Sequence, residues 1–105
     1  MSSWGTMTLL EQLGNIGSEV ERYASWKSKA KLERANNAFY RAVDLFNASL
    51  NDERWPLYRK KEIGRLKESF CDTVYGAKLY GAPIEYFQKY FLQCAIAAKN
   101  TKVNG

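Results

Sequence analysis

Two short runs of lysine and arginine hold the residues best suited to binding a charged partner. Residues 22–34 contain five cations against Glu33 alone, and residues 59–67 contain five against Glu62 alone. Runs of this kind attract phosphate, so they predict contact with RNA or DNA. The alternative is that these cations only cap helix ends and keep the protein soluble. The candidate nucleic-acid-binding residues are Lys27, Lys29, Lys31, Arg34, Arg59, Lys60, Lys61, Arg65 and Lys67.

Residues for catalysis are scarce. The chain has no histidine, which removes both the commonest general base and the commonest metal ligand. Cys71 and Cys94 match no redox or zinc spacing, and we expect two unbridged, buried thiols. Neither of the glycine-rich phosphate-binding motifs is present. The sequence therefore predicts a protein that is not an enzyme and needs no cofactor or metal; an enzyme using Asp, Glu, Lys or Tyr is the most distant alternative.

Length and composition indicate one domain. The 105 residues are 46% hydrophobic and 26% charged, with a net charge of +5, and they are long enough to bury a single core. Apolar runs are short, and residues 1–6 lack the basic and apolar regions of a signal peptide. We therefore expect a single domain over residues 1–105, no membrane association and a cytoplasmic location.

Apolar spacing predicts the elements that position the cations. Apolar residues recur at steps of three and four positions from Leu9 to Tyr23, which predicts a helix from about Thr8 to Trp26. The same spacing of apolar residues predicts a second helix over about Lys31–Ala48. Ser28 is the best helix-capping residue between them, so we expect a turn within residues 27–30; one continuous helix is the alternative.

Prolines and glycines delimit two more helices. Pro56 and Gly76 favour a third helix that ends near Tyr75. Residues 76–82 read as a loop, and Pro83 opens a fourth helix that should fray near Asn100 into a loose tail over about residues 100–105. Four amphipathic helices with short connections predict an all-α fold, an antiparallel up-down-up-down four-helix bundle.

Several helical residues carry more specific expectations. Gly14 and Gly17 weaken the first helix. Their presence indicates either that a neighbouring helix approaches closely there or that the helix simply tolerates the two glycines. Trp55 should fold back onto the end of the core. Glu19 and Asp72 lie near apolar stripes, and each would need a cationic partner such as Arg22 or Arg65.

Aromatic residues outside the stripes suggest surfaces for binding. Tyr and Trp are enriched in protein interfaces. Trp26 and Tyr58, which adjoin basic residues, could also stack on unpaired bases. The candidate residues for an oligomer or partner interface are Tyr40, Tyr58, Tyr80 and Tyr86.

Six motifs carry a resemblance that spans residues 4–98. They are Gly14-Asn15-Ile16-Gly17-Ser18-Glu19-Val20, Trp26-Lys27, Ala38-Phe39-Tyr40-Arg41-Ala42-Val43-Asp44-Leu45, Asp52-Glu53-Arg54-Trp55, Arg65-Leu66-Lys67-Glu68-Ser69-Phe70-Cys71-Asp72 with Tyr75-Gly76, and Tyr90-Phe91-Leu92-Gln93-Cys94-Ala95. Through them the chain resembles small bacterial four-helix-bundle proteins. In size, charge and architecture it is similar to the accessory variability determinant proteins of diversity-generating retroelements; ribosomal intervening-sequence bundles are a comparable alternative.

That resemblance implies a basic homo-oligomer that binds a reverse transcriptase and its template RNA. Our first hypothesis is accordingly a non-enzymatic oligomeric adaptor that presents basic surfaces to RNA or DNA and also binds a partner protein. The alternative is a protein-interaction bundle that has no nucleic-acid role and binds one partner chain through its tyrosines.

Overall fold

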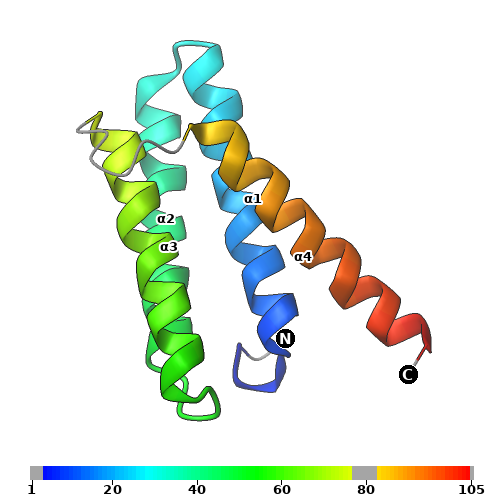
Figure 1. The fold of residues 1–105 in the computed structure, drawn as a ribbon. Helices are drawn as coiled ribbons and strands as arrows, with labels where there is room; N and C mark the ends of the chain where they lie inside the picture. Colours follow the sequence, from blue (N-terminus) through cyan, green and yellow to red (C-terminus); the bar gives the residue numbers. More distant parts are fainter. Residues whose placement is uncertain (1–3, 77–82, 105) are drawn as a thin grey trace.

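The computed structural model describes residues 4–76 and 83–104, and over these ranges its regular structure is entirely helical. Figure 1 shows the α-helices lying alongside one another, with the last part of α4 diverging from the rest. The predicted all-α fold with four helices is therefore confirmed. The elements are a short 3-10 helix, η1 (Trp4–Thr6), followed by α1 (Leu9–Ser28), α2 (Leu32–Leu50), α3 (Leu57–Tyr75) and α4 (Ile84–Asn104).

Helix α1 begins with a reciprocal cap. The Thr8 hydroxyl accepts a hydrogen bond from the Glu11 backbone N–H at 3.1 Å, and Glu11 Oε1 accepts one from the Thr8 backbone N–H at 2.9 Å. The pair satisfies two backbone donors that the helix itself leaves unpaired. This confirms the expected start near Thr8.

The turn between α1 and α2 spans residues 29–31. Ala30 has a φ of +57°, a left-handed conformation that is uncommon for residues other than glycine. The predicted break is confirmed, and the alternative of one continuous helix is wrong. Ser28 does not cap α2, because its hydroxyl donates to the Ser25 carbonyl inside α1, and α2 starts after Lys31 without a side-chain cap.

Proline and glycine delimit α3 as predicted. Pro56 is extended immediately before the helix, and Gly76 ends it with a φ of +75°. Pro83 precedes α4, also as predicted, and α4 continues to Asn104, past the expected fraying near Asn100. No glycine or proline interrupts residues 84–104, so no local signal ends the helix earlier. Residues 77–82 of the predicted loop lie outside the described ranges.

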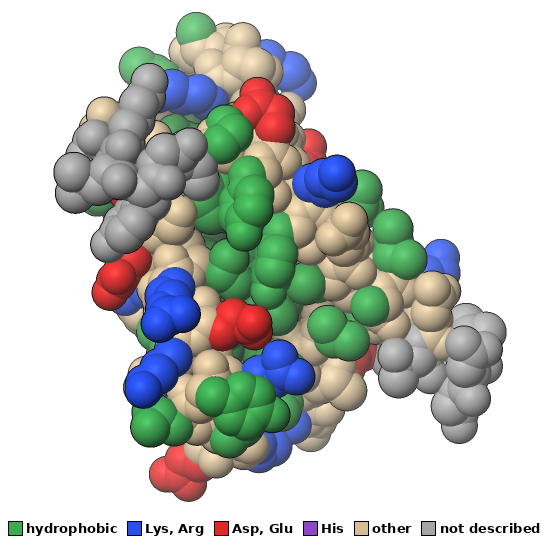
Figure 2. All heavy atoms as spheres, in the orientation of Figure 1, with side chains coloured by type: hydrophobic (Ala, Val, Ile, Leu, Met, Phe, Trp, Pro, Cys, Tyr) green, Lys and Arg blue, Asp and Glu red, His purple; other side chains and the backbone are tan. Residues whose placement is uncertain are grey.

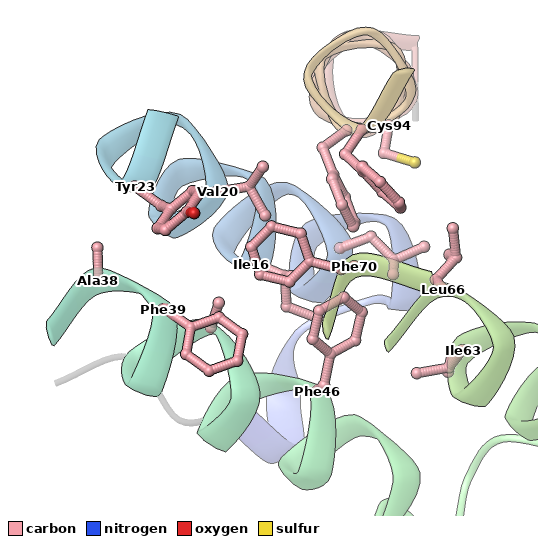
Figure 3. Close-up of a cluster of buried hydrophobic side chains, with 14 of the residues drawn as sticks. Ile16, Val20, Tyr23, Ala38, Phe39, Phe46, Ile63, Leu66, Phe70 and Cys94 are labelled. Carbon is pink, nitrogen blue, oxygen red and sulfur yellow. The ribbon is translucent and has the colours of Figure 1, made fainter. Parts of the chain in front are cut away.

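Phenylalanines form the centre of the core (Figure 3). The Phe70 ring centroid lies 6.2 Å from that of Phe46 and 5.6 Å from that of Phe87, and Phe46 lies 6.1 Å from Phe91. These separations fall in the range at which aromatic rings attract one another. The apolar stripes predicted for the helices therefore meet, as expected.

Helix α1 is the central element. It packs closely along both α2 and α4, whereas α2 packs along α3 and α3 barely touches α4. Gly14 and Gly17 face α4, where they lie against Ala95 and Phe91. Close helix approach, rather than tolerance, therefore explains Gly17, whereas an added Cβ at Gly14 would make only ordinary contact with Ala95. The ribbon in Figure 1 shows α4 moving away from α3 toward the C-terminus.

A buried glutamine joins the beginning of the chain to the turn between α2 and α3. The Gln12 side chain is fully buried, and its Nε2 donates to the Trp4 carbonyl at 3.0 Å and to Asp52 Oδ2 at 2.9 Å. Its Oε1 accepts hydrogen bonds from Ser49 Oγ at 2.8 Å and Trp55 Nε1 at 2.9 Å. All four hydrogen-bonding positions of the amide are used. Trp55 thus folds back onto the core, as predicted.

Two predicted buried acids lie in the helical core region. Glu19 accepts hydrogen bonds from Arg22 at 2.9 Å and from Arg41 at 3.1 Å, so it links α1 to α2. Arg22 was the expected partner, and Arg41 was not foreseen. Asp72 on α3 is also buried, as expected.

Candidate functional site

Four cations surround the turn between α1 and α2, and we call them the turn cluster. Arg34 places its guanidinium 4.8 Å from the centroid of the Trp26 ring, and the Lys29 ammonium lies 5.3 Å from it. Trp26 itself packs against the core. The indole therefore positions two cations through cation–π attraction. The turn cluster consists of Lys27, Lys29, Lys31 and Arg34, all of them exposed.

The second set of candidate cations, the α3 cluster, divides into residues with and without partners. Arg59 pairs with Glu62 at 3.5 Å and lies 5.2 Å from the Tyr58 ring centroid. Lys67 donates to Asn47 Oδ1 at 2.7 Å and so links α3 to α2. Lys61 and Arg65 are exposed on α3. The α3 cluster consists of Arg59, Lys60, Lys61, Arg65 and Lys67.

Carboxylates neutralise little of this charge. Of the nine candidate cations, only Arg59 forms an ion pair within the part of the chain that the structure describes. Arg22, Arg41 and Arg54, which the sequence analysis did not include among the candidates, form the other ion pairs. The positive charge of both clusters therefore stays available to an anionic partner.

The two clusters do not form one site. The turn cluster lies where α2 begins, and the α3 cluster follows the turn where α2 ends. At about 1.5 Å per residue, the 19 residues of α2 separate these two turns by roughly 28 Å. A single chain therefore offers two distinct basic surfaces.

An open groove runs along the seam between α3 and α4. Its volume is about 800 Å³, and a second hollow of about 420 Å³ adjoins it and shares Tyr58, Glu62 and Tyr90 in its lining. Figure 2 shows hydrophobic side chains gathered in a band between the two helices, with cations on the α3 side. We call this the α3–α4 groove; its main part is lined by Tyr58, Lys61, Glu62, Arg65, Leu66, Glu68, Ser69, Tyr86 and Tyr90.

The groove collects two of the predicted interface tyrosines. Tyr58 and Tyr86 are 67% and 51% exposed and line it from opposite helices. Tyr40 is exposed on α2 beside Phe39, away from the groove, and Tyr80 lies outside the described residues. Tyr90 also lines the groove but was not among the predicted interface residues; its spacing of four from Tyr86 was the signal that both tyrosines share one face.

Burial lowers the reactivity of the two thiols of the described residues. Cys71 and Cys94 are free thiols, and burial raises the pKa of both. A raised pKa leaves less of the reactive thiolate at neutral pH. Within residues 4–76 and 83–104, no three potential ligands among Cys, Asp and Glu gather as a metal site would require.

Two further findings bear on function. Among the described residues, no helix combines the length and hydrophobicity that crossing a bilayer requires. Comparison with models of protein families, with curated proteins and with solved structures found no match. The likeness to retroelement accessory proteins therefore stays a prediction from the sequence.

Proposed function

We propose that this chain is a non-enzymatic adaptor that binds RNA or DNA through its turn cluster and α3 cluster. One observation carries the proposal: eight of the nine candidate cations have no carboxylate partner among the described residues, although the chain contains 11 acidic residues. Uncompensated Lys and Arg groups bind phosphate by releasing condensed counterions. Such binding needs neither a metal nor a cofactor.

The separation of the clusters supports an oligomeric form of this adaptor. One chain offers two basic surfaces beside turns that lie roughly 28 Å apart, whereas repetition of both surfaces in a homo-oligomer would extend them along a nucleic acid. The sequence resemblance adds a reverse transcriptase as the partner protein, and the adaptor would act in the cytoplasm. Tyr40, which is exposed outside the groove, is a further candidate for subunit contact.

We also infer the antiparallel up-down-up-down topology from contacts that run in opposite order along neighbouring helices. Along α1 and α2, Gln12 contacts Ser49 whereas Glu19 contacts Arg41. Along α1 and α4, Gly14 lies against Ala95, and Glu21 accepts a hydrogen bond from Gln88. Aromatic contacts follow the same rule for α2 and α3, where Phe39 meets Tyr75 and Phe46 meets Phe70. This topology places the two basic clusters at opposite ends.

A protein-interaction bundle without nucleic acid is the second candidate function. The α3–α4 groove favours it, because exposed tyrosines beside a groove that also contains buried Leu66 are typical of protein-binding surfaces. Both functions can coexist in one chain, since the turn cluster lies outside the groove.

Charge reversal tests the nucleic-acid role. The double variant Lys27→Glu, Lys31→Glu should weaken binding of a fluorescent single-stranded RNA by about tenfold or more, since each phosphate contact depends on a cation. The variant Lys89→Glu, Lys99→Glu makes the same change in net charge at exposed positions of α4 and is the matched control. Equal loss in both variants, or no loss in the first, would refute a specific role for the turn cluster.

A further inference from the structure

The α3–α4 seam differs from the other helix seams because it is open. α3 and α4 meet where Phe70 contacts Phe87. From this contact toward the start of α3, the α3–α4 groove lies between the two helices in place of packed side chains. Leu66 and Tyr90 belong to its apolar floor, while Tyr58 and Tyr86 stand at its sides. A groove between two helices that has an apolar floor and tyrosines and charged residues at its sides is suited to a further, amphipathic helix.

We propose that the α3–α4 groove binds one amphipathic helix of another protein, which places an apolar stripe in the groove and carboxylates opposite Lys61 and Arg65. On α3 the groove extends from Tyr58 to Ser69, which is about 17 Å, or about three helical turns. A partner helix of this length presents apolar residues at positions i, i+4 and i+7 along one face. The proposal gives the adaptor a protein-binding surface and does not depend on nucleic-acid binding by the turn cluster.

The charges at the groove favour an acidic partner. Lys61 and Arg65 are four residues apart, so they lie on one face of α3, and neither has an ion pair among the described residues. Glu62, which also lines the groove, pairs with Arg59. Glu68, which also lines the groove, follows Arg65 by three residues on α3, but the two form no ion pair among the described residues, so Lys61 and Arg65 both stay open to carboxylates of a partner.

The same charges argue against a second copy of this chain as the occupant. The exposed apolar face of α4 contains Leu92 and Ile96, which are 61% and 50% exposed. Lys89 and Lys99, both exposed, flank these two residues along the helix. Placing this face in the groove would bring lysines toward Lys61 and Arg65, and like charges at an interface oppose association.

Designed peptides test the proposal with the full chain. The probe is an 18-residue helical peptide with leucines at i, i+4 and i+7 and glutamates on both flanks; its counterpart has lysines in place of the glutamates. Titration of isotope-labelled protein, followed by NMR, should shift the backbone amides of Leu66 and Tyr90 with the acidic peptide. The basic peptide should bind at least about tenfold more weakly. Equal binding of both peptides, or shifts confined to other surfaces, would overturn the proposal.

Two variants separate this proposal from the nucleic-acid function. Tyr86→Ser should weaken peptide binding at least about tenfold while RNA binding is unchanged. Lys27→Glu, Lys31→Glu should do the reverse. A circular dichroism melt shows that each variant is folded, and sedimentation shows its oligomeric state. A dimer that dissociates in Tyr86→Ser would identify a second copy as the occupant and overturn the proposal.

Discussion

Gly17 on α1 lies directly against Phe91 on α4. A Cβ atom added to Gly17 would fall 2.4 Å from the Phe91 Cβ and 3.1 Å from its Cγ. Phe91 is buried, and its ring also contacts Phe46 on α2. The absence of a side chain at residue 17 therefore allows α4 to pack on α1 and determines one side of the α3–α4 groove.

Alanine at residue 17 should separate these helices. Gly17→Ala gains helix propensity but overpacks the contact with Phe91, so we expect the free energy of unfolding to fall by about 1–2 kcal/mol. Gly64→Ala on α3 is the matched control, because its added Cβ would meet no atom within 4 Å apart from its chain neighbours and the nearby backbone of its own helix. It should raise the free energy of unfolding by about 0.5–1 kcal/mol. Urea denaturation measures both, and equal effects of the two changes would contradict the close contact.

Loss of the buried amide should weaken the attachment of the N-terminal segment. Gln12→Ala removes four hydrogen bonds and leaves Ser49 and Trp55 with unpaired polar atoms, which should cost about 2–4 kcal/mol of unfolding free energy. Asn15→Ala, an exposed change on the same helix, should alter stability by less than about 0.5 kcal/mol. Tryptophan fluorescence during urea denaturation reports the transition, and similar midpoints for the two variants would refute the structural role of Gln12.

Stability should fall in acid because of Asp52. Hydrogen bonds from Arg54, together with one from Gln12, hold the pKa of the Asp52 carboxyl well below its usual value near 4. A depressed pKa in the folded state means that the carboxylate stabilises the fold above that usual value, and this stabilisation is lost as the pH falls below it. Asp52→Asn should reduce the loss of urea resistance between pH 5 and pH 2. Glu53→Gln is the matched control and should keep the wild-type dependence of urea resistance on pH. The proposed role of Asp52 is wrong if Asp52→Asn keeps that dependence as well.

Both thiols should react slowly in the folded protein. Burial raises the pKa of Cys94 and of Cys71, so little thiolate forms at pH 8. Alkylation by iodoacetamide, followed by mass spectrometry, should be at least about tenfold slower than in urea for Cys94, which is the more buried thiol. Rapid modification of native Cys94 would show that this part of α4 does not stay packed on α1.

The sequence was sufficient to predict the helices but not how they cross. Spacing of three and four residues identifies an apolar stripe, and Pro56, Gly76 and Pro83 mark helix boundaries through their backbone geometry alone. The open α3–α4 seam depends on the angle between two helices, which no stripe encodes. Gly17 indicated that another helix packs closely at this position, but the sequence did not identify Phe91 as the residue in contact.

Side-chain partners were also beyond the sequence. The exposure of the turn cluster followed from its place beside a predicted turn. In contrast, the contacts of Arg34 with Trp26 and of Lys67 with Asn47 join residues through rotamers and tertiary packing that local spacing does not specify. Tyr58 and Tyr86 were predicted as interface residues separately, and only the fold places them on opposite sides of one groove.

The salt dependence of RNA binding tests the central claim most directly. If the turn cluster contacts phosphates, the logarithm of the association constant for RNA should fall linearly with the logarithm of the salt concentration. Lys27→Glu, Lys31→Glu should make this slope less steep by about 1.4, which corresponds to the loss of two phosphate contacts on single-stranded RNA. The measurement is fluorescence anisotropy of a labelled single-stranded RNA between 50 and 300 mM KCl, with Lys89→Glu, Lys99→Glu retaining the wild-type slope. A wild-type affinity that does not change with salt, or a slope that the turn-cluster variant leaves unaltered, would contradict the account.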